Sequence, residues 1–435
     1  MKCIQCQMDN TLKDRTDNNG RCKQCGHQFV FEPTTMGTTK VTDGMFAKAI
    51  ADLSANNTLY FTANQLFHLL DKRLHSKSTF GGVASLILCG FLTAITLIVF
   101  VLPNLSRGNV GALFVPGAIN LFFLLVLLNQ STTRKASARS RRIAARCLQI
   151  QGIALLVGGL LMSVELSSFI LFAFAVVVGL LAMYLGRWQY RVQANTAQKP
   201  LIEWNQFREW LNRWQQINPI ATLLSPPSEN ALPAAIDPEV TAYSFDRLVV
   251  TDSATIAHVL IANNFHFENN CAILSITGYP QSIFQTTMEM LRRNPKLEVF
   301  AFHDCSGEGM ALGHHLRTHS QWFANTTIEI FDVGLRPRQV VALPNVSIAN
   351  TTESANVAKR LAPAVRQQLS ADELAWLDEG NVVLLESFTT QRLIQALNRG
   401  IAGSRSYLAE SSSGGSDFIF IGDGSSSYYT VDSFG

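Results

Sequence analysis

The stretch VFAFHDCSGEGMALGHHLR, residues 299–317, decides the fold of the C-terminal half of this 435-residue chain. It begins as an apolar strand and stops at His303 and Asp304. A polar turn with two glycines follows, and then a helix-like segment that carries further histidines. In parallel α/β sheets, sites lie where strands end in this way. The stretch therefore has three candidate roles: a catalytic loop, a metal site or the remains of one.

The residues around this stretch alternate between short apolar strands and helices from about residue 244 onward. We expect strands over 245–252, 271–277, 297–303, 327–333 and 381–387, with helices between them, including one that opens near Gly309 and one over 353–369. This alternation predicts a doubly wound α/β domain, residues 240–408, with a parallel sheet covered on both faces. Asp252, Gly278 and Asp304 fall at predicted strand ends.

An apolar region lies upstream of this domain, between residues 80 and 185. Four uncharged runs occur there, over 80–102, 110–128, 147–164 and 166–185. Each is close to the ~20 residues that a helix needs to cross a bilayer. Buried helices of a soluble core are the alternative, which four such runs in succession disfavour. The sequence therefore predicts four transmembrane helices.

Lysine and arginine are distributed unevenly around these spans. Twelve of them flank the spans on one side, six of these in the loop between the second and third spans, whereas the other side holds only Arg107. The positive-inside rule places both termini in the cytoplasm of a multi-pass inner (cell) membrane protein. The N-terminus lacks the pattern of a cleavable signal peptide.

The lipid bilayer is the first partner that this charge pattern predicts. The basic loop is expected to attract anionic lipid headgroups, and binding of nucleic acid by the loop is the alternative. The net charge of +3 is too small to argue for nucleic acid as a partner of the whole chain.

Four of the eight cysteines form one pattern. Cys3, Cys6, Cys22 and Cys25 read C-x2-C-x15-C-x2-C, a spacing that predicts a closed tetrahedral site for a structural Zn²⁺ ion. Two disulfides are the alternative, disfavoured in a reducing cytoplasm. The polar segment 10–21 is expected to form a hairpin tip. Residues 1–32 resemble the zinc-ribbon family, whose members bind proteins as readily as nucleic acid.

The remaining segments connect these parts. Residues 43–78 read as a small helical module compatible with a winged helix, and residues 187–238 as an amphipathic helix followed by a proline-rich linker. Tryptophans on one face of that helix favour a position in the membrane interface, and packing against the following domain is the alternative. Residues 409–435 form a Ser/Gly-rich tail expected to be flexible, in which the run FIFI, 418–421, offers an additional strand.

The α/β region resembles a Toprim domain, in the form found in the A subunit of topoisomerase VI. Five segments match the family's motifs in order: RLVVTDSATIAHVL (247–260), ILSITGYP (273–280), VFAFHDCSGEGMAL (299–312), FDVGLRPRQV (331–340) and VVLLESF (382–388). The resemblance implies a Toprim fold over about a third of the chain. It also implies chemistry in which three acids hold Mg²⁺ at a transferring phosphate.

The acids of that family are poorly matched here. Its first glutamate falls at Thr251, with Asp252 one place later, and its first aspartate falls at Phe302. Its second aspartate is kept as Asp304, and Cys305 replaces its proline. The family's upstream tyrosine nucleophile has Phe67 and His68 in its place. The resemblance therefore implies an inactivated Toprim-like domain, and an unrelated doubly wound domain is the alternative.

Other readings of the opening stretch stay open. An active metal-dependent nuclease or phosphotransferase would use Asp252, Asp304 and Glu308 with Mg²⁺. His315 and His319, one helical turn apart, could hold Zn²⁺ or Mn²⁺ together with His303 and Asp304. Cys305 or Ser306 could act as a nucleophile with His303 as base, although neighbours at a strand end rarely meet that geometry. A phosphate-binding turn is disfavoured by the charge of Glu308.

The functional expectation combines these parts. We expect a membrane-anchored, non-catalytic scaffold or sensor that binds a protein, or less favourably a nucleic acid, through its cytoplasmic ribbon and its inactivated domain. Transport is disfavoured because the spans carry no charged residue.

Overall fold

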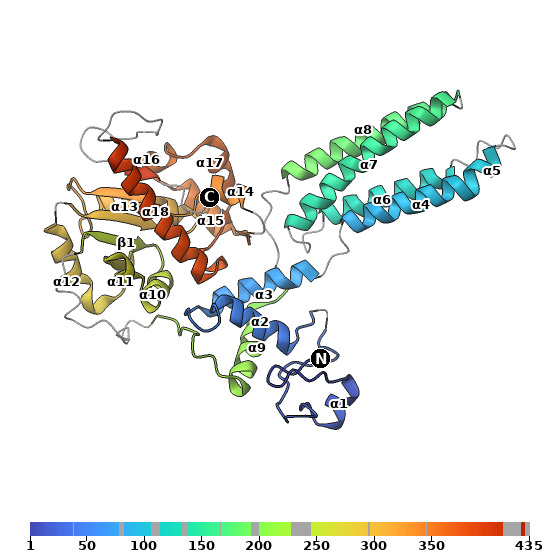
Figure 1. Cartoon of the computed structure of the whole chain (residues 1–435). Helices are drawn as coiled ribbons and strands as arrows, with labels where there is room; N and C mark the ends of the chain where they lie inside the picture. Colours follow the sequence, from blue (N-terminus) through green and yellow to red (C-terminus); the bar gives the residue numbers. More distant parts are fainter. Residues whose placement is uncertain are drawn as a thin grey trace. The chain divides into compact units, whose positions relative to one another are not determined.

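The structure is a computed structural model of the chain, and it separates into two compact units (Figure 1). One unit comprises Met1–Asp71 with Ile202–Gly435, and the other comprises Lys72–Leu201. The structure describes residues 1–37, 39–77, 82–105, 114–132, 138–165, 167–192, 200–227, 245–294, 296–343, 346–411 and 428–430.

The second unit consists of long apolar helices. The described elements are α4 (Gly82–Thr96), a π-helical turn (Leu97–Val101), α5 (Leu102–Leu105), α6 (Phe114–Thr132), α7 (Ala138–Glu165) and α8 (Phe169–Val192). Four stretches are long and apolar enough to cross a membrane: Val83–Asn104, Val115–Thr132, Ser140–Glu165 and Phe169–Tyr190. The prediction of four candidate spans is confirmed. The third begins earlier than predicted, so that Arg141, Arg142 and Arg146 lie on α7 and not in a loop.

Helices α7 and α8 pack closely because glycines line their contact. A side chain on Gly152 would meet the backbone oxygen of Gly179, and one on Gly159 would collide with Ala175. Polar side chains also join neighbouring helices: Gln151 of α7 donates to the backbone oxygen of Asn120 on α6 at 3.1 Å. Small residues and interhelical hydrogen bonds are the usual means by which helices associate in a bilayer.

The first unit begins with the cysteine-rich segment. Two antiparallel bridges, Lys2 to Asp9 and Arg21 to Gln28, frame it. The helix α1 (Leu12–Asp17) fills the middle, where a hairpin tip was predicted. The helix forms because Thr11 and Asp14 make a capping box, in which each side chain accepts a hydrogen bond from the other's backbone N–H.

A helical platform follows, made of α2 (Asp43–Leu53), α3 (Ala63–Lys77) and α9 (Trp204–Ile217); α3 belongs to this unit up to Asp71. The apolar face of α9 is buried within this unit, so the expected position in the membrane interface is wrong for this face. Trp214 packs on Phe31 and Phe46, with ring centroids 6.1 and 4.8 Å away. Burial of large aromatic surfaces against the ribbon and α2 explains the amphipathic pattern.

The α/β domain contains the parallel sheet that the sequence predicts. Its strands are β1 (Arg247–Thr251), β2 (Cys271–Ser275), β3 (Glu298–Phe302), β4 (Glu329–Asp332) and β7 (Tyr428–Thr430), in the order β2-β1-β3-β4-β7. All neighbours in this sheet are parallel. Helices between or after these strands are α10 (Ala254–Ala262), α11 (Phe265–Asn269), α12 (Gln281–Arg292), α13 (Gly307–Thr318) and α14 (Pro337–Ala342). The strand order reverses between β1 and β3, which is where such sheets place their sites.

The C-terminal part differs from the prediction. Residues 381–387 do not extend the parallel sheet: β6 (Asn381–Val382) pairs antiparallel with β5 (Ala349–Asn350), and a 3-10 turn, Leu385–Ser387, follows. The helix expected over 353–369 is two helices, α15 (Thr352–Lys359) and α16 (Pro363–Arg366), because the residue before a proline disfavours helical geometry. Helices α17 (Ala371–Asp378) and α18 (Thr390–Ser411) complete the domain. The FIFI run lies outside the described residues.

Candidate functional site

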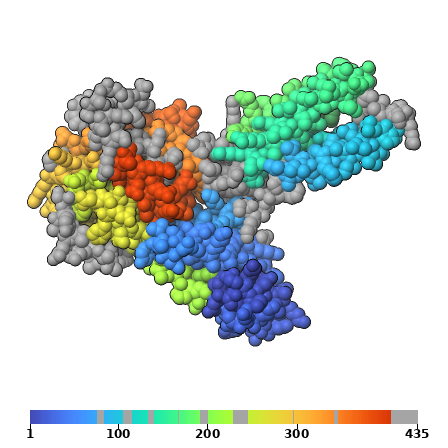
Figure 2. Space-filling model, viewed as in Figure 1, coloured from blue at the N-terminus to red at the C-terminus, as the bar shows by residue number. Residues whose placement is uncertain are grey.

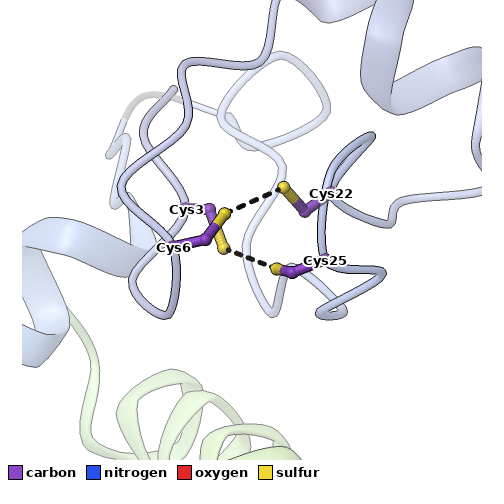
Figure 3. Close-up of side chains that lie close together, drawn as sticks. All are labelled: Cys3, Cys6, Cys22 and Cys25. Atoms are coloured by element: carbon purple, nitrogen blue, oxygen red, sulfur yellow. Dashed lines mark hydrogen bonds between the residues drawn. The ribbon is translucent and has the colours of Figure 1, made fainter.

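The four cysteines of the N-terminal segment come together as predicted. Cys3 Sγ lies 3.7 Å from Cys25 Sγ, and Cys6 Sγ lies 3.6 Å from Cys22 Sγ (Figure 3). All four sulfurs lie within 4.8 Å of one another. A tetrahedral ion about 2.3 Å from each sulfur requires sulfurs about 3.8 Å apart. The cluster therefore fits one four-coordinate metal ion, with no place left for a substrate.

The ionisation of these thiols also fits a cation. Burial opposes ionisation of Cys22, yet the N–H groups of Cys25 and Gln24 and the side chain of Asn10 lower the pKa of that thiol to about 6. At Cys6, the Met8 N–H favours the thiolate, but desolvation and the neighbouring thiols outweigh it and raise the pKa to about 12. Four crowded sulfurs cannot all carry charge without a cation between them, and a divalent ion supplies it.

Asn10 positions one of these ligands, which the sequence pattern did not indicate. It is fully buried, and its Nδ2 donates to Cys22 Sγ at 3.4 Å. Its Oδ1 accepts a hydrogen bond from the Lys23 N–H at 3.0 Å. Arg15 Nη1 donates to the Asn10 backbone oxygen at 2.8 Å and pairs with Glu32. Such outer contacts orient metal ligands, and nothing in the C-x2-C spacing reveals them.

The ribbon is joined to the platform through a buried carboxylate. Asp43, at the start of α2, accepts hydrogen bonds from Val30 N–H at 3.0 Å and Phe31 N–H at 2.9 Å. Phe31 is 3% exposed and lies among the aromatic rings of α2 and α9. In Figure 2 the ribbon, in dark blue, abuts the atoms of this platform. The cysteine cluster thus sits on a lobe that is anchored by both polar and aromatic contacts.

The second site lies at the carboxyl ends of β1 and β3. Thr251 and Phe302 pair in register there, and both side chains are fully buried. The next residues hold the acids: Asp252 Oδ2 accepts the Asp304 N–H at 2.7 Å, and Asp304 Oδ1 accepts the Leu385 N–H at 2.5 Å. Burial, and then the charge of Asp252, raise the pKa of Asp304 well above its ordinary value. Burial likewise raises the pKa of Asp252.

Beside the acids lies a buried ion pair that the sequence did not predict. His303 is fully buried; its Nε2 lies 2.9 Å from Asp332 Oδ1, and its Nδ1 lies 2.8 Å from the Asp304 carbonyl oxygen. Both partners are acceptors, so both ring nitrogens donate and the imidazole is charged. Burial opposes this charge, but Asp332 outweighs it and raises the pKa of His303. Arg336 also binds Asp332, at 2.7 Å.

This arrangement contradicts two alternative readings of the opening stretch. His303 has both nitrogens engaged and cannot act as a base for Cys305 or Ser306. Cys305 is fully buried, and burial raises the pKa of its thiol well above the ordinary value. Ser306 caps α13, its Oγ accepting the Gly309 N–H at 3.0 Å. The nucleophile reading is therefore wrong, because the turn serves to start a helix.

The reading of a histidine-held metal ion is also wrong. His315 and His319 stack on each other, with ring centroids 4.7 Å apart, whereas His303 is bound to Asp332. Across the described part of the chain, the cysteine cluster is the one group of three or more histidine, cysteine or acidic side chains close enough to share an ion. Asp252, Asp304 and Glu308 do not form such a group in this structure, and Glu308 is exposed.

Phe67, which stands in place of the upstream tyrosine nucleophile of the topoisomerase family, has a packing role. Phe67 lies on α3 and contacts Trp204 and Phe207 of α9, with ring centroids 5.4 and 5.5 Å away. Burial lowers the pKa of its neighbour His68.

No protein-family model matches the chain, and no curated protein matches it.

Proposed function

We propose that the protein is a membrane-anchored, non-catalytic scaffold or sensor, with a zinc ribbon and an inactivated Toprim-like domain held on one helical platform. The observation that carries this proposal is the platform itself. Its helices α3 and α9 immediately precede and follow the four candidate spans in sequence, and it binds the ribbon through Asp43 and Phe31. The same platform contacts the α/β domain, since Gln65 Nε2 of α3 donates to the Phe388 backbone oxygen at 3.0 Å.

This packing supports a topology with both ends on one side of the membrane. Phe67 precedes the first span and contacts Phe207, which follows the last. Two segments can pack directly only if they lie on the same side, which requires an even number of crossings. The excess of basic residues on that side identifies it as the cytoplasm under the positive-inside rule.

Zinc is the proposed ion of the four-cysteine centre. Four thiolates in a closed tetrahedron are the usual ligand set of structural zinc sites. The ribbon has few apolar residues, so metal binding supplies the free energy that its small core lacks. The ion's role is thus to hold the lobe that presents a binding surface to a partner, and a protein is the favoured partner because the net charge of +3 gives little attraction for nucleic acid.

Lack of catalysis is supported by the strand ends. Thr251 and Phe302 stand where the Toprim family has its first two acids. They are paired neighbours on β1 and β3, and neither carries a carboxylate. Asp252 and Asp304 each accept a backbone N–H. Carboxylates that hold the local backbone in this way have a structural reason to be present.

One observation favours the alternative of an active metal-dependent nuclease or phosphotransferase. Asp252 Oδ1 is buried and has no hydrogen-bond partner. A buried, unpaired carboxylate oxygen is costly unless it is protonated or bound to a cation. Mg²⁺ at this oxygen, with Asp304 and Glu308 as further ligands, would give the enzyme reading.

The deciding experiment uses the full chain in detergent or nanodiscs. The purified protein is incubated with DNA and RNA in Mg²⁺ or Mn²⁺, beside Asp304→Asn and the exposed control Asp372→Asn. We expect no cleavage or joining above the buffer rate for any of the three. Metal-dependent turnover that the wild type and Asp372→Asn share, and that Asp304→Asn loses, would replace the scaffold proposal with the enzyme.

A further inference from the structure

The 3-10 turn Leu385–Ser387 lies between the strand-end acids and helix α3. The Leu385 N–H donates to Asp304 Oδ1 at 2.5 Å. The next residue faces the other way: Glu386 Oε2 accepts from Asn64 Nδ2 at 2.6 Å, and its Oε1 accepts from Thr62 Oγ1 at 3.4 Å. Two consecutive residues therefore hold the site on one side and the first turn of α3 on the other.

The chain before this turn is fixed to β3. The Cys305 N–H donates to the Val383 oxygen at 2.9 Å, and the Val383 N–H donates to the Cys305 oxygen at 3.0 Å. This backbone pair does not involve the Asp304 side chain. We therefore expect the pairing of Val383 with Cys305 to persist when the contact between Asp304 and Leu385 changes.

The chain after this turn is fixed to the platform. Gln65 Nε2 donates to the Phe388 oxygen at 3.0 Å, and Thr390 Oγ1 donates to the Tyr60 oxygen at 2.9 Å. Gln65 and Thr390 are 1% and 0% exposed. Hydrogen bonds in such dry surroundings are costly to break, so movement of the turn is transmitted to α3 and not absorbed by water.

Several charged groups lie near the Asp304 carboxylate. Asp252 projects from the end of β1 and Glu386 from the turn, and both raise the pKa of Asp304, after burial. His303, paired with Asp332, lies on the same strand end, and the exposed Glu308 follows on α13. A ligand or proton that binds Asp304 Oδ1 competes with the Leu385 N–H for this oxygen.

We propose that the Leu385–Glu386 turn is a relay that reports the state of the Asp304 carboxylate to helix α3. The inference deepens the proposed sensor function and rests on it. When Asp304 Oδ1 is withdrawn from the Leu385 N–H, the turn loosens its hold on Thr62 and Asn64. Helix α3 precedes the first candidate span in sequence, so the relay connects the α/β domain to the helix next to the membrane region in the chain.

Hydrogen–deuterium exchange of the full chain in nanodiscs tests the relay. Asp304→Ala removes the acceptor, and we expect amide exchange to rise on the order of fivefold or more, the lower range of typical coupling, at residues 385–387 and also at Gln65 and Leu66. The Val383 amide should stay protected. Asp304→Asn keeps an acceptor oxygen and should restore protection, and the exposed control Asp372→Ala should change neither region.

The reverse direction provides a second arm, because coupling between two sites is reciprocal. Asn64→Ala should raise exchange at 385–387 while β2 stays protected. The relay would be overturned if Asp304→Ala raised amide exchange at 385–387 but not at Gln65 and Leu66. It would also be overturned if Asn64→Ala left exchange at 385–387 unchanged. If Asp304→Ala also exposes β2, the domain has unfolded and the Asn64→Ala arm decides. Nucleic-acid cleavage would overturn the non-catalytic role without changing these exchange rates, so the two failures are distinguishable.

Discussion

Phe67 and Phe207 lie in contact, with ring centroids 5.5 Å apart, although all four candidate spans separate them in sequence. The helix after the last span thus packs on Phe67 and, through Trp210 and Trp214, also on the ribbon's Phe31. A contact of this kind constrains a membrane protein more than the length of any one helix does, because it ties together two ends that the bilayer could otherwise separate.

The first prediction concerns topology. Reporter domains fused after residue 71 and after residue 411 should both be active only in the cytoplasmic format, because both positions belong to one packed unit and basic residues flank the spans on that side. A fusion in the short connection between α5 and α6 should show the opposite format. Opposite results at the two chain ends would mean an odd number of crossings and would exclude the Phe67–Phe207 contact.

The second prediction concerns the metal. The purified full chain should contain one zinc ion, and Cys22→Ser should lose it, whereas Cys271→Ala, a buried cysteine of the sheet, should keep it. Elemental analysis with a protein assay measures the ratio. Retention of zinc by Cys22→Ser would place the ion elsewhere.

The third prediction isolates Asn10. Asn10→Ala removes the N–H that Cys22 Sγ accepts, so zinc affinity measured by chelator competition should fall about 10–100-fold. Asn18→Ala is a matched control, since Asn18 is an exposed amide of the same ribbon that bonds only the Asp14 oxygen. With Co²⁺ in place of zinc, the sulfur charge-transfer band should shift in Asn10→Ala and not in the control. Equal affinities in the two variants would contradict a positioning role.

Sequence patterns predicted some of these features and not others, for physical reasons. Cys3 and Cys25 were identifiable because ligand chemistry dictates both residue type and spacing, and the strands ending at Thr251 and Phe302 because burial on both faces leaves an apolar run. Trp214 was assigned to the wrong environment, since an apolar helix face has the same pattern against lipid and against protein. The pairing of His303 with Asp332 joins residues on different strands, and one sequence gives no measure of that distance.

The fourth prediction tests the environment of α9. Trp214 is 3% exposed between Phe31 and Phe46, whereas Trp204 at the start of the same helix is 39% exposed. Trp214→Ala should destabilise the ribbon–platform core by about 3–5 kcal/mol, and Trp204→Ala by much less. Denaturant unfolding, monitored by the release of zinc, measures the loss of stability in both variants. Similar small effects of the two substitutions would instead favour a position of α9 in the membrane interface.

The fifth prediction concerns pH. The pKa values of His303 and Asp304 are both raised. Burial opposes the charge of His303, but Asp332 outweighs it and raises the pKa of that histidine. Burial raises the pKa of Asp304. Groups with raised pKa bind protons more tightly in the folded state, so their contribution to stability is present at low pH and is lost as the pH rises through the folded values. For His303 this loss begins above its ordinary value of about 6.5. Exchange protection of β1 and β3 should therefore fall as the pH rises above about 6.5.

Asp304→Asn separates the acid's share of this dependence from that of the histidine. Asparagine resembles the protonated acid and still offers an oxygen to the Leu385 N–H, so the variant should match the protection of the wild type at low pH, where Asp304 is protonated, and exceed it at high pH, where Asp304 is ionised. Because the ribbon is identical in both proteins, the opposite pH dependence of metal–thiolate binding cancels in the difference. A gain at high pH would mean that Asp304 is retained at a cost in stability, as residues with a function often are. A variant that is less protected at every pH would make Asp304 a purely structural acceptor and would remove the charge that the relay is proposed to read.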